Sequence, residues 1–259
     1  MVCYVEYIKY YDVVIIDSGM DMYSSLHSKL KVEGLTISPN GDSYYVTKGT
    51  YQDTIGHGTA VVDALTKTLI NKNIFIIKLF TIDTEITEYD IEFALQYVIQ
   101  HIHCKVINLS LGIRSCANKD KLEKLCATLL AKGVIIVAAF DNMGSVSYPA
   151  AFDSVIGIDC SFNLYDLNSY EFIENSIVNI RGPIKQQRLL WLNNEKRMLN
   201  GNSFFAPRIT AKILKLIEAG FNTKKSILAE LKKGSIKTIS YDIPVSYTHL
   251  RAHETPEHL

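Results

Sequence analysis

The sequence lacks an excess of charge of either sign: 27 lysines and arginines stand against 27 aspartates and glutamates in 259 residues. Neutralising the phosphates of a nucleic acid takes clustered basic side chains, so no nucleic-acid partner is expected. A hydrophobic content of 47% with no net charge also excludes a disordered chain. A single α/β domain of this length buries enough surface to fold without a disulfide or a metal.

The five cysteines are odd in number and irregularly spaced, and no two of them form a CxxC pair. This excludes a zinc ribbon or a dithiol redox site, and we expect no metal and no other cofactor. The longest apolar run, Val134 to Phe140, is far shorter than the roughly 18 residues of a membrane helix, so no membrane partner is expected. Residues 1–12 do not have the pattern of a signal peptide, which favours a cytoplasmic location and reduced thiols.

Short β-branched runs alternate with segments of helical periodicity along most of the chain. The runs predict buried strands over residues 13–16, 74–79, 106–109, 134–139 and 155–158. Apolar residues at a 3.6-residue period predict helices over residues 59–70, 88–101, 119–132, 203–219 and 224–233. The alternation predicts an α/β fold, in which a parallel β-sheet is flanked by helices on both faces as a three-layer sandwich. Residues 161–200 are polar and irregular, and no helix is predicted there.

The chain shows no linker rich in proline, glycine or serine, so residues 1–245 are expected to form one domain. Residues 246–259 differ from the rest, because they carry several histidines but no apolar periodicity. His249 and His253 have the spacing of two metal ligands on one helix face, but Pro256 would interrupt such a helix. The segment resembles translated sequencing adaptor, and we expect a non-native or disordered tail.

Three polar segments lie beside apolar strands or helices. Asp17 follows the first predicted strand, His57 lies between two glycines before a helix, and Ser203 begins another helix with Pro207 in its first turn. Taken alone, each has a structural explanation: Asp17 as a turn acid, the segment of His57 as a capping loop, and Ser203 as a helix cap. Each also has a chemical one, because a carboxylate, an imidazole and a hydroxyl at a helix N-terminus are the parts of an acyl-transfer triad.

In this order, the segments resemble those of the subtilisin-like serine proteases, the subtilases of peptidase family S8. The resemblance rests on five stretches: VIIDSGMD (14–21), GHGT (56–59), VINLSLG (106–112), VAAFDNMG (137–144) and GNSFFAP (201–207). One such motif is weak evidence, whereas five in the correct order are strong evidence. The resemblance implies the subtilisin-like fold and a serine endopeptidase that acts on a peptide or protein substrate.

The resemblance also implies the roles of the site residues. Ser203 would attack the scissile carbonyl, His57 would accept its proton and Asp17 would hold His57. Asn142 and the backbone N–H of Ser203 would donate hydrogen bonds to the oxyanion. An extended substrate would lie in a cleft lined by Ser110, Leu111, Gly112, Ala139 and Asp141.

Two departures from the family pattern bear on activity. Asp141 stands where glycine is usual: it would repel the oxyanion, point into the first specificity pocket and favour a basic P1 side chain, or be a solvated loop acid. Phe204 and Phe205 replace smaller residues after the nucleophile, so Phe205 must find room in the helix–sheet packing.

The leading interpretation is an active protease that matures a dedicated intracellular peptide or protein, and it rests on the compact chain and on analogy. The alternative is a catalytically inactive or very slow subtilase-like domain that binds peptides. A nucleotide-binding protein is disfavoured, because no glycine-rich phosphate loop follows the first predicted strand.

Overall fold

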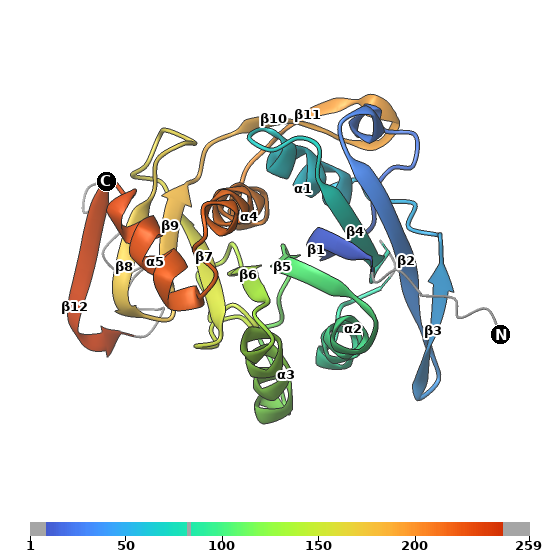
Figure 1. Cartoon of the computed structure of the whole chain (residues 1–259), viewed down its shortest axis with the longest axis horizontal. Coiled ribbons are helices and arrows are strands. Elements are labelled where there is room, and N and C mark those ends of the chain that lie inside the picture. Colours follow the sequence, from blue (N-terminus) through green and yellow to red (C-terminus); the bar gives the residue numbers. More distant parts are fainter. Residues whose placement is uncertain (1–8, 82–83, 246–259) are drawn as a thin grey trace.

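The computed structural model describes residues 9–81 and 84–245. They form a ten-stranded sheet in the order β12-β8-β9-β7-β6-β5-β1-β4-β2-β3, and a separate hairpin of β10 and β11 (Figure 1). The five predicted strands are all present, as β1 (Tyr10–Asp17), β4 (Asn73–Lys78), β5 (His103–Leu109), β6 (Ile135–Ala139) and β7 (Val155–Ser161). They lie next to one another in the sheet and pair in parallel.

The five predicted helices are also present, as α1 (His57–Thr66), α2 (Glu88–His101), α3 (Lys119–Ala131), α4 (Asn202–Glu218) and α5 (Lys224–Lys233). Figure 1 shows α1 and α4 on one face of the sheet, and α2 and α3 on the other. The α/β fold with a mostly parallel sheet between two helical layers is therefore confirmed.

The central strand β1 explains why both faces need a helical layer. Its residues Val13 and Ile15 belong to the core under α1 and α4, whereas Val14 and Ile16 belong to the core under α2 and α3. All four side chains are fully buried. A strand that is apolar on both faces is stable only between two covering layers, and this accounts for the continuous β-branched run in the sequence.

Several strands were not predicted. They are β2 (Lys31–Asn40), β3 (Ser43–Lys48), β8 (Glu171–Ser176), β9 (Ile180–Pro183), β10 (Gln187–Leu190), β11 (Lys196–Leu199) and β12 (Lys237–Val245). Two short 3₁₀ helices, η1 (Ser25–Ser28) and η2 (Leu192–Asn194), were also not predicted. Most of these strands lie toward the sheet edges or in the hairpin, where polar side chains break up the apolar pattern.

The prediction of one domain over residues 1–245 stays a prediction, and the predicted tail at residues 246–259 lies outside the described residues. In the described part of the chain, no helix is both long enough and apolar enough to cross a membrane.

Candidate active site

Three neighbouring strands deliver polar residues to one edge of the sheet. Asp17 is the last residue of β1, Ser110 directly follows β5, and Asp141 and Asn142 follow β6 after one intervening residue. Because β6, β5 and β1 are adjacent and parallel, their carboxyl ends meet at the same edge. This is the edge at which ligands bind in parallel sheets.

Asp17 and His57 are in direct contact at this edge. Helix α1 begins at His57, after Gly56 in the left-handed region (φ 102°), and His57 Nδ1 lies 2.7 Å from Asp17 Oδ1. The Asp17 side chain is fully buried, whereas that of His57 is 24% exposed. The carboxylate therefore holds the proton on Nδ1 and leaves the lone pair on Nε2, which is the tautomer of a general base.

The protonation of His57 is set by competing effects. Burial disfavours the charged imidazolium and by itself lowers the pKa of His57. The neighbouring Asp17 carboxylate acts in the opposite direction through its charge and its hydrogen bond, and the charge of Asp53 adds to it. The net result is a pKa of His57 above its ordinary value of 6.5.

Ser203 is the second residue of α4, and its hydroxyl does not cap the helix. The N-cap position belongs to Gly201, and Ser203 Oγ donates to the carbonyl oxygen of Ser110 at 3.0 Å. In return, Ser110 Oγ donates to the carbonyl oxygen of Ser203 at 2.7 Å. This reciprocal pair fixes the start of α4 against the end of β5.

The prediction that Pro207 lies in the first turn of the helix is wrong, because α4 begins at Asn202 and Pro207 is its sixth residue. A proline has no N–H, so the carbonyl four residues earlier, that of Ser203, receives no helical hydrogen bond from it. This is the carbonyl to which the Ser110 hydroxyl donates. Because Pro207 cannot donate to it, the carbonyl oxygen of Ser203 is available to the Ser110 hydroxyl, and this hydrogen bond joins α4 to the end of β5.

The nucleophile candidate and the base candidate lie on adjoining helix ends. Phe204, next to Ser203, has its ring centroid 5.2 Å from that of His57. Among the described residues, the Ser203 hydroxyl donates to Ser110 and not to His57. The structure thus brings Asp17 and His57 into contact, places Phe204 next to His57, and turns the Ser203 hydroxyl toward the end of β5.

Asn142 lies against the start of α4. Its Oδ1 accepts the backbone N–H of Asn202 at 2.9 Å. Gly201 passes so close that a Cβ at that position would lie 2.9 Å from Asn142 Oδ1. Asn142 and Ser203 are therefore held at the same helix N-terminus, where backbone N–H groups have no helical acceptor.

The residues expected to line the cleft differ in their surroundings. Ser110 and Leu111 are buried, and Ala139 is 3% exposed and packs in the hydrophobic core. A Cβ at Gly112 would lie 3.1 Å from the carbonyl oxygen of Tyr148, so glycine permits a close approach of these two segments. The next residue, Ile113, forms an antiparallel bridge with Tyr148, and this bridge fixes one side of the segment.

Asp141 is tied into its own loop. Its carboxylate accepts the backbone N–H groups of Met143 at 3.1 Å and Ser145 at 2.9 Å. It also forms an ion pair with Arg114. The charge of Asp141 is thus matched by a cation and by two backbone donors within the loop.

Asp53 is a functional candidate that the sequence analysis missed. It is 1% exposed and lies four residues before His57. Its carboxylate accepts hydrogen bonds at 2.7–3.0 Å from the hydroxyls of Ser18 and Thr59 and from the backbone N–H groups of Ile55, Gly56 and Thr59. Asp53 therefore holds together the turn after Asp17 and the loop that carries His57.

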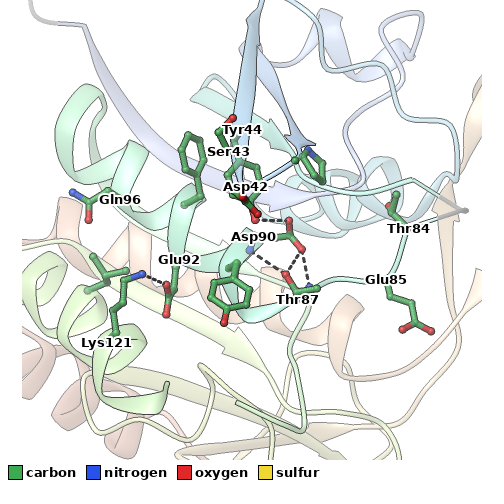
Figure 2. Close-up of a pocket in the computed structure, with 15 residues that line it drawn as sticks. Asp42, Ser43, Tyr44, Thr84, Glu85, Thr87, Asp90, Glu92, Gln96 and Lys121 are labelled. Atoms are coloured by element: carbon green, nitrogen blue, oxygen red, sulfur yellow. Dashed lines mark hydrogen bonds and ion pairs between the residues drawn. The ribbon is translucent and has the colours of Figure 1, made fainter. Parts of the chain in front are cut away.

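A groove of about 1010 Å³ lies away from this edge, between the β2–β3 hairpin and α2 (Figure 2). Its polar groups pair mainly with one another: Asp90 caps α2 through Thr87 and accepts from the Tyr44 hydroxyl, and Glu92 pairs with Lys121. It contains none of the predicted site residues. Within residues 9–81 and 84–245, no three His, Cys, Asp or Glu side chains are grouped so as to hold a metal ion.

Comparison with known proteins shows the family and the fold. The model of the subtilase family matches residues 11–239. A solved structure described as an S41 psychrophilic protease superposes with a TM-score of 0.69 at 17% identity, covering 88% of this chain and 85% of that one. A cold adapted subtilisin-like serine proteinase gives a TM-score of 0.65 at 16% identity, covering 86% and 81%. These structural matches show the fold, and the family model covers most of the chain. The chain therefore belongs to the subtilase family and is a serine-type endopeptidase.

Proposed function

We propose that this chain hydrolyses peptide bonds with Asp17, His57 and Ser203 as its catalytic triad. The observation that carries the proposal is the 2.7 Å contact between His57 Nδ1 and the buried carboxylate of Asp17, at the sheet edge to which α4 brings Ser203. A buried carboxylate that orients an imidazole beside a serine at a helix N-terminus is an arrangement suited to acyl transfer.

In the first half of the reaction, Ser203 Oγ forms a bond to the scissile carbonyl carbon while its proton passes to His57 Nε2. Asn142 Nδ2 and the Ser203 backbone N–H donate to the oxygen on which negative charge develops. When the C–N bond breaks, the same proton passes from His57 to the leaving amine. Water then repeats the sequence on the acyl-enzyme, and Asp17 stabilises the imidazolium each time.

In this scheme, the first step is the breaking of the hydrogen bond from the Ser203 hydroxyl to Ser110. Ser203 Oγ must leave the Ser110 carbonyl oxygen and turn toward Nε2 of His57 before the proton can move. Catalytic hydrogen bonds often form fully only when the substrate is bound. Ser110 borders the edge that is expected to pair with an extended substrate, so substrate binding and this rotation occur at the same place.

The proposal extends to an intracellular role in maturing a dedicated peptide or protein. The compact chain, with only 40 residues from Asp17 to His57, supports it. The predicted preference for a basic P1 side chain stays a prediction. The pairing of Asp141 with Arg114 favours the alternative in which Asp141 is a loop acid.

A fluorophosphonate probe, which reacts with an activated serine, tests the triad. We expect the wild-type chain to be labelled at Ser203 and Ser203→Ala to remain unlabelled, with hydrolysis of a peptide substrate lost in parallel. Thr128→Ala, which removes an exposed hydroxyl far along α3, is the matched control and should be labelled like the wild type. A wild-type chain that binds peptides but resists labelling would instead establish the inactive, peptide-binding alternative.

A further inference from the structure

We propose that Asn202 is the positioning residue of the oxyanion hole: it holds the loop of Asn142 so that the amide N–H of Asn142 faces the reacting carbonyl. The inference rests on the proposed role of Asn142 and names the group on which that role depends. Asn202 directly precedes the nucleophile and is fully buried.

The backbone of Asn202 decides which way the Asn142 amide points. An asparagine side chain has an oxygen that accepts and a nitrogen that donates. The Asn202 N–H donates to Asn142 Oδ1 at 2.9 Å, so the oxygen is the atom that faces the Asn202 backbone and the nitrogen is the atom left to donate elsewhere. An oxyanion needs a donor, and this orientation supplies one.

The side chain of Asn202 holds the backbone of the same loop. Its Nδ2 lies 3.0 Å from the carbonyl oxygen of Phe140 and 3.1 Å from that of Asp141. These are the two residues that join β6 to Asn142. Asn202 thus contacts three consecutive residues of the loop, two through its side chain and one through its backbone.

Asp159 fixes the orientation of Asn202 in turn. Its Oδ1 lies 2.9 Å from Asn202 Nδ2, and Asp159 is 1% exposed on β7, the strand next to β6. A reversed Asn202 amide would set its oxygen against one carboxylate and two carbonyl oxygens. The contacts therefore run from Asp159 through Asn202 to the loop of Asn142.

The oxygen of this side chain has different surroundings from its nitrogen. Asn202 Oδ1 is buried, and no hydrogen-bond partner for it is found in the described part of the chain. A buried amide oxygen without a partner is unfavourable. The side-chain contacts that hold Asn202 are therefore those of Nδ2, to the loop of Asn142 and to Asp159.

The test is a double-mutant cycle with Asn142, in which kcat and KM are measured on a chromogenic peptide. Asn142→Ala should lower kcat about 10²–10³-fold with little change in KM, the range known for loss of such a donor in a subtilisin. Asn202→Ala should lower kcat at least about 10-fold, again with KM nearly constant. In the Asn142→Ala background, however, Asn202→Ala should have almost no further effect, because the donor that it positions is already gone.

Ser161→Ala removes a buried hydroxyl from β7. It is the control for loss of a buried polar group in this part of the sheet and should leave kcat unchanged. Multiplicative losses from Asn142→Ala and Asn202→Ala, or an effect of Asn202→Ala on KM alone, would overturn the inference. Asn202→Ser is the second variant should alanine prevent folding, and the same cycle applies to it. If Asn142→Ala itself leaves kcat unchanged, the proposed oxyanion hole fails, and this result is distinct from failure of the role of Asn202.

Discussion

His57 lies near two buried carboxylates that do different work. Asp17 touches the imidazole at 2.7 Å, whereas Asp53 acts on it through its charge and by holding the surrounding loop. Both favour the imidazolium and raise the pKa of His57, against the effect of burial. Since the proposed mechanism needs a neutral His57 to accept the proton of Ser203, activity should fall as the pH drops through that raised pKa.

Asp53→Asn should separate these two influences. Removing the negative charge of Asp53 lowers the pKa of His57, so the acidic limb of the profile of log kcat/KM against pH should move to lower pH. The measurement is that profile, taken on a substrate with no titrating group. Asp21→Asn is the matched control: Asp21 is also a buried acid that accepts backbone N–H groups, but it does not contribute to the pKa of His57. A limb that moves equally in both variants, or that moves upward in Asp53→Asn, would contradict the role assigned to Asp53.

The residues that the sequence analysis missed share one property. Asp17, His57 and Ser203 can be recognised from short local motifs, whereas Asp53 and Asn202 each join their own segment to a distant one. Asp53 meets Ser18, which is 35 residues away, and the side chain of Asn202 meets Asp159, which is 43 residues away. A buried polar side chain that acts through tertiary contacts leaves no periodic pattern in the sequence.

At the scale of elements, prediction succeeded where one pattern continued through a whole element. The runs of β1 and β5 are apolar on both faces, so they were found. The start of α1 was placed at Thr59, but the helix begins at His57, because Gly56 takes a left-handed conformation that ends the loop earlier. Strands such as β3, whose side chains are largely exposed, carry no comparable pattern, and their place follows from pairing with β2.

The hairpin of β10 and β11 shows how an unpredicted element supports the site. Trp191, at its turn, packs on Gly56, where a Cβ would overlap the indole ring. The backbone N–H of Leu190 donates to Asp63 of α1 at 2.8 Å. The residue before His57 is thus covered by a segment more than 130 positions later in the chain.

Phe205, which is larger than the residue usual at its position, finds room in the packing of α4 against the sheet. Its ring is 1% exposed and lies against Gly182 of β9, where any Cβ would overlap it. We expect Gly182→Ala to lower the free energy of unfolding by about 1–3 kcal/mol, as overpacking does. Phe205→Leu in the same chain should recover part of this loss, because the smaller side chain makes room for the new methyl group.

Urea unfolding of the wild type, both single variants and the double variant measures this coupling. Two results would show that Gly182 does not make the room for the Phe205 ring. One is a Gly182→Ala variant as stable as the wild type, and the other is a double variant whose loss of unfolding free energy equals the sum of the two single losses.

For the molecule as a whole, the four cysteines of the described residues are distributed over both hydrophobic cores, so their reactivity can show whether either core opens. Cys160 lies in the core under α1 and α4, and Cys104, Cys116 and Cys126 lie in the core under α2 and α3. All four are buried. Burial raises the pKa of Cys104 and of Cys126 to about 12, and that of Cys116 to about 11.

Because the thiolate is the reactive form, Cys104, Cys116 and Cys126 should not react with iodoacetamide at pH 8 in the folded protein. Cys160, which is fully buried, should be protected because the reagent cannot reach it. All four should react after denaturation, and intermediate urea concentrations should expose them together. Mass spectrometry of a Cys3→Ser variant makes the measurement, since Cys3 lies outside the described residues. Rapid modification of one cysteine in the folded protein would indicate local opening of the layer that contains it.

The missing N–H of Pro207 has a consequence for how Ser110 and Ser203 are joined. The Ser110 hydroxyl donates to the carbonyl oxygen of Ser203, which receives no hydrogen bond from Pro207. The Ser203 hydroxyl donates in turn to the carbonyl oxygen of Ser110. The end of β5 and the start of α4 are thereby joined by two hydrogen bonds between the same two residues. If the cleft is lined as proposed, a shift of Ser110 on substrate binding would break the bond that holds the Ser203 hydroxyl, so the substrate itself would release the proposed nucleophile.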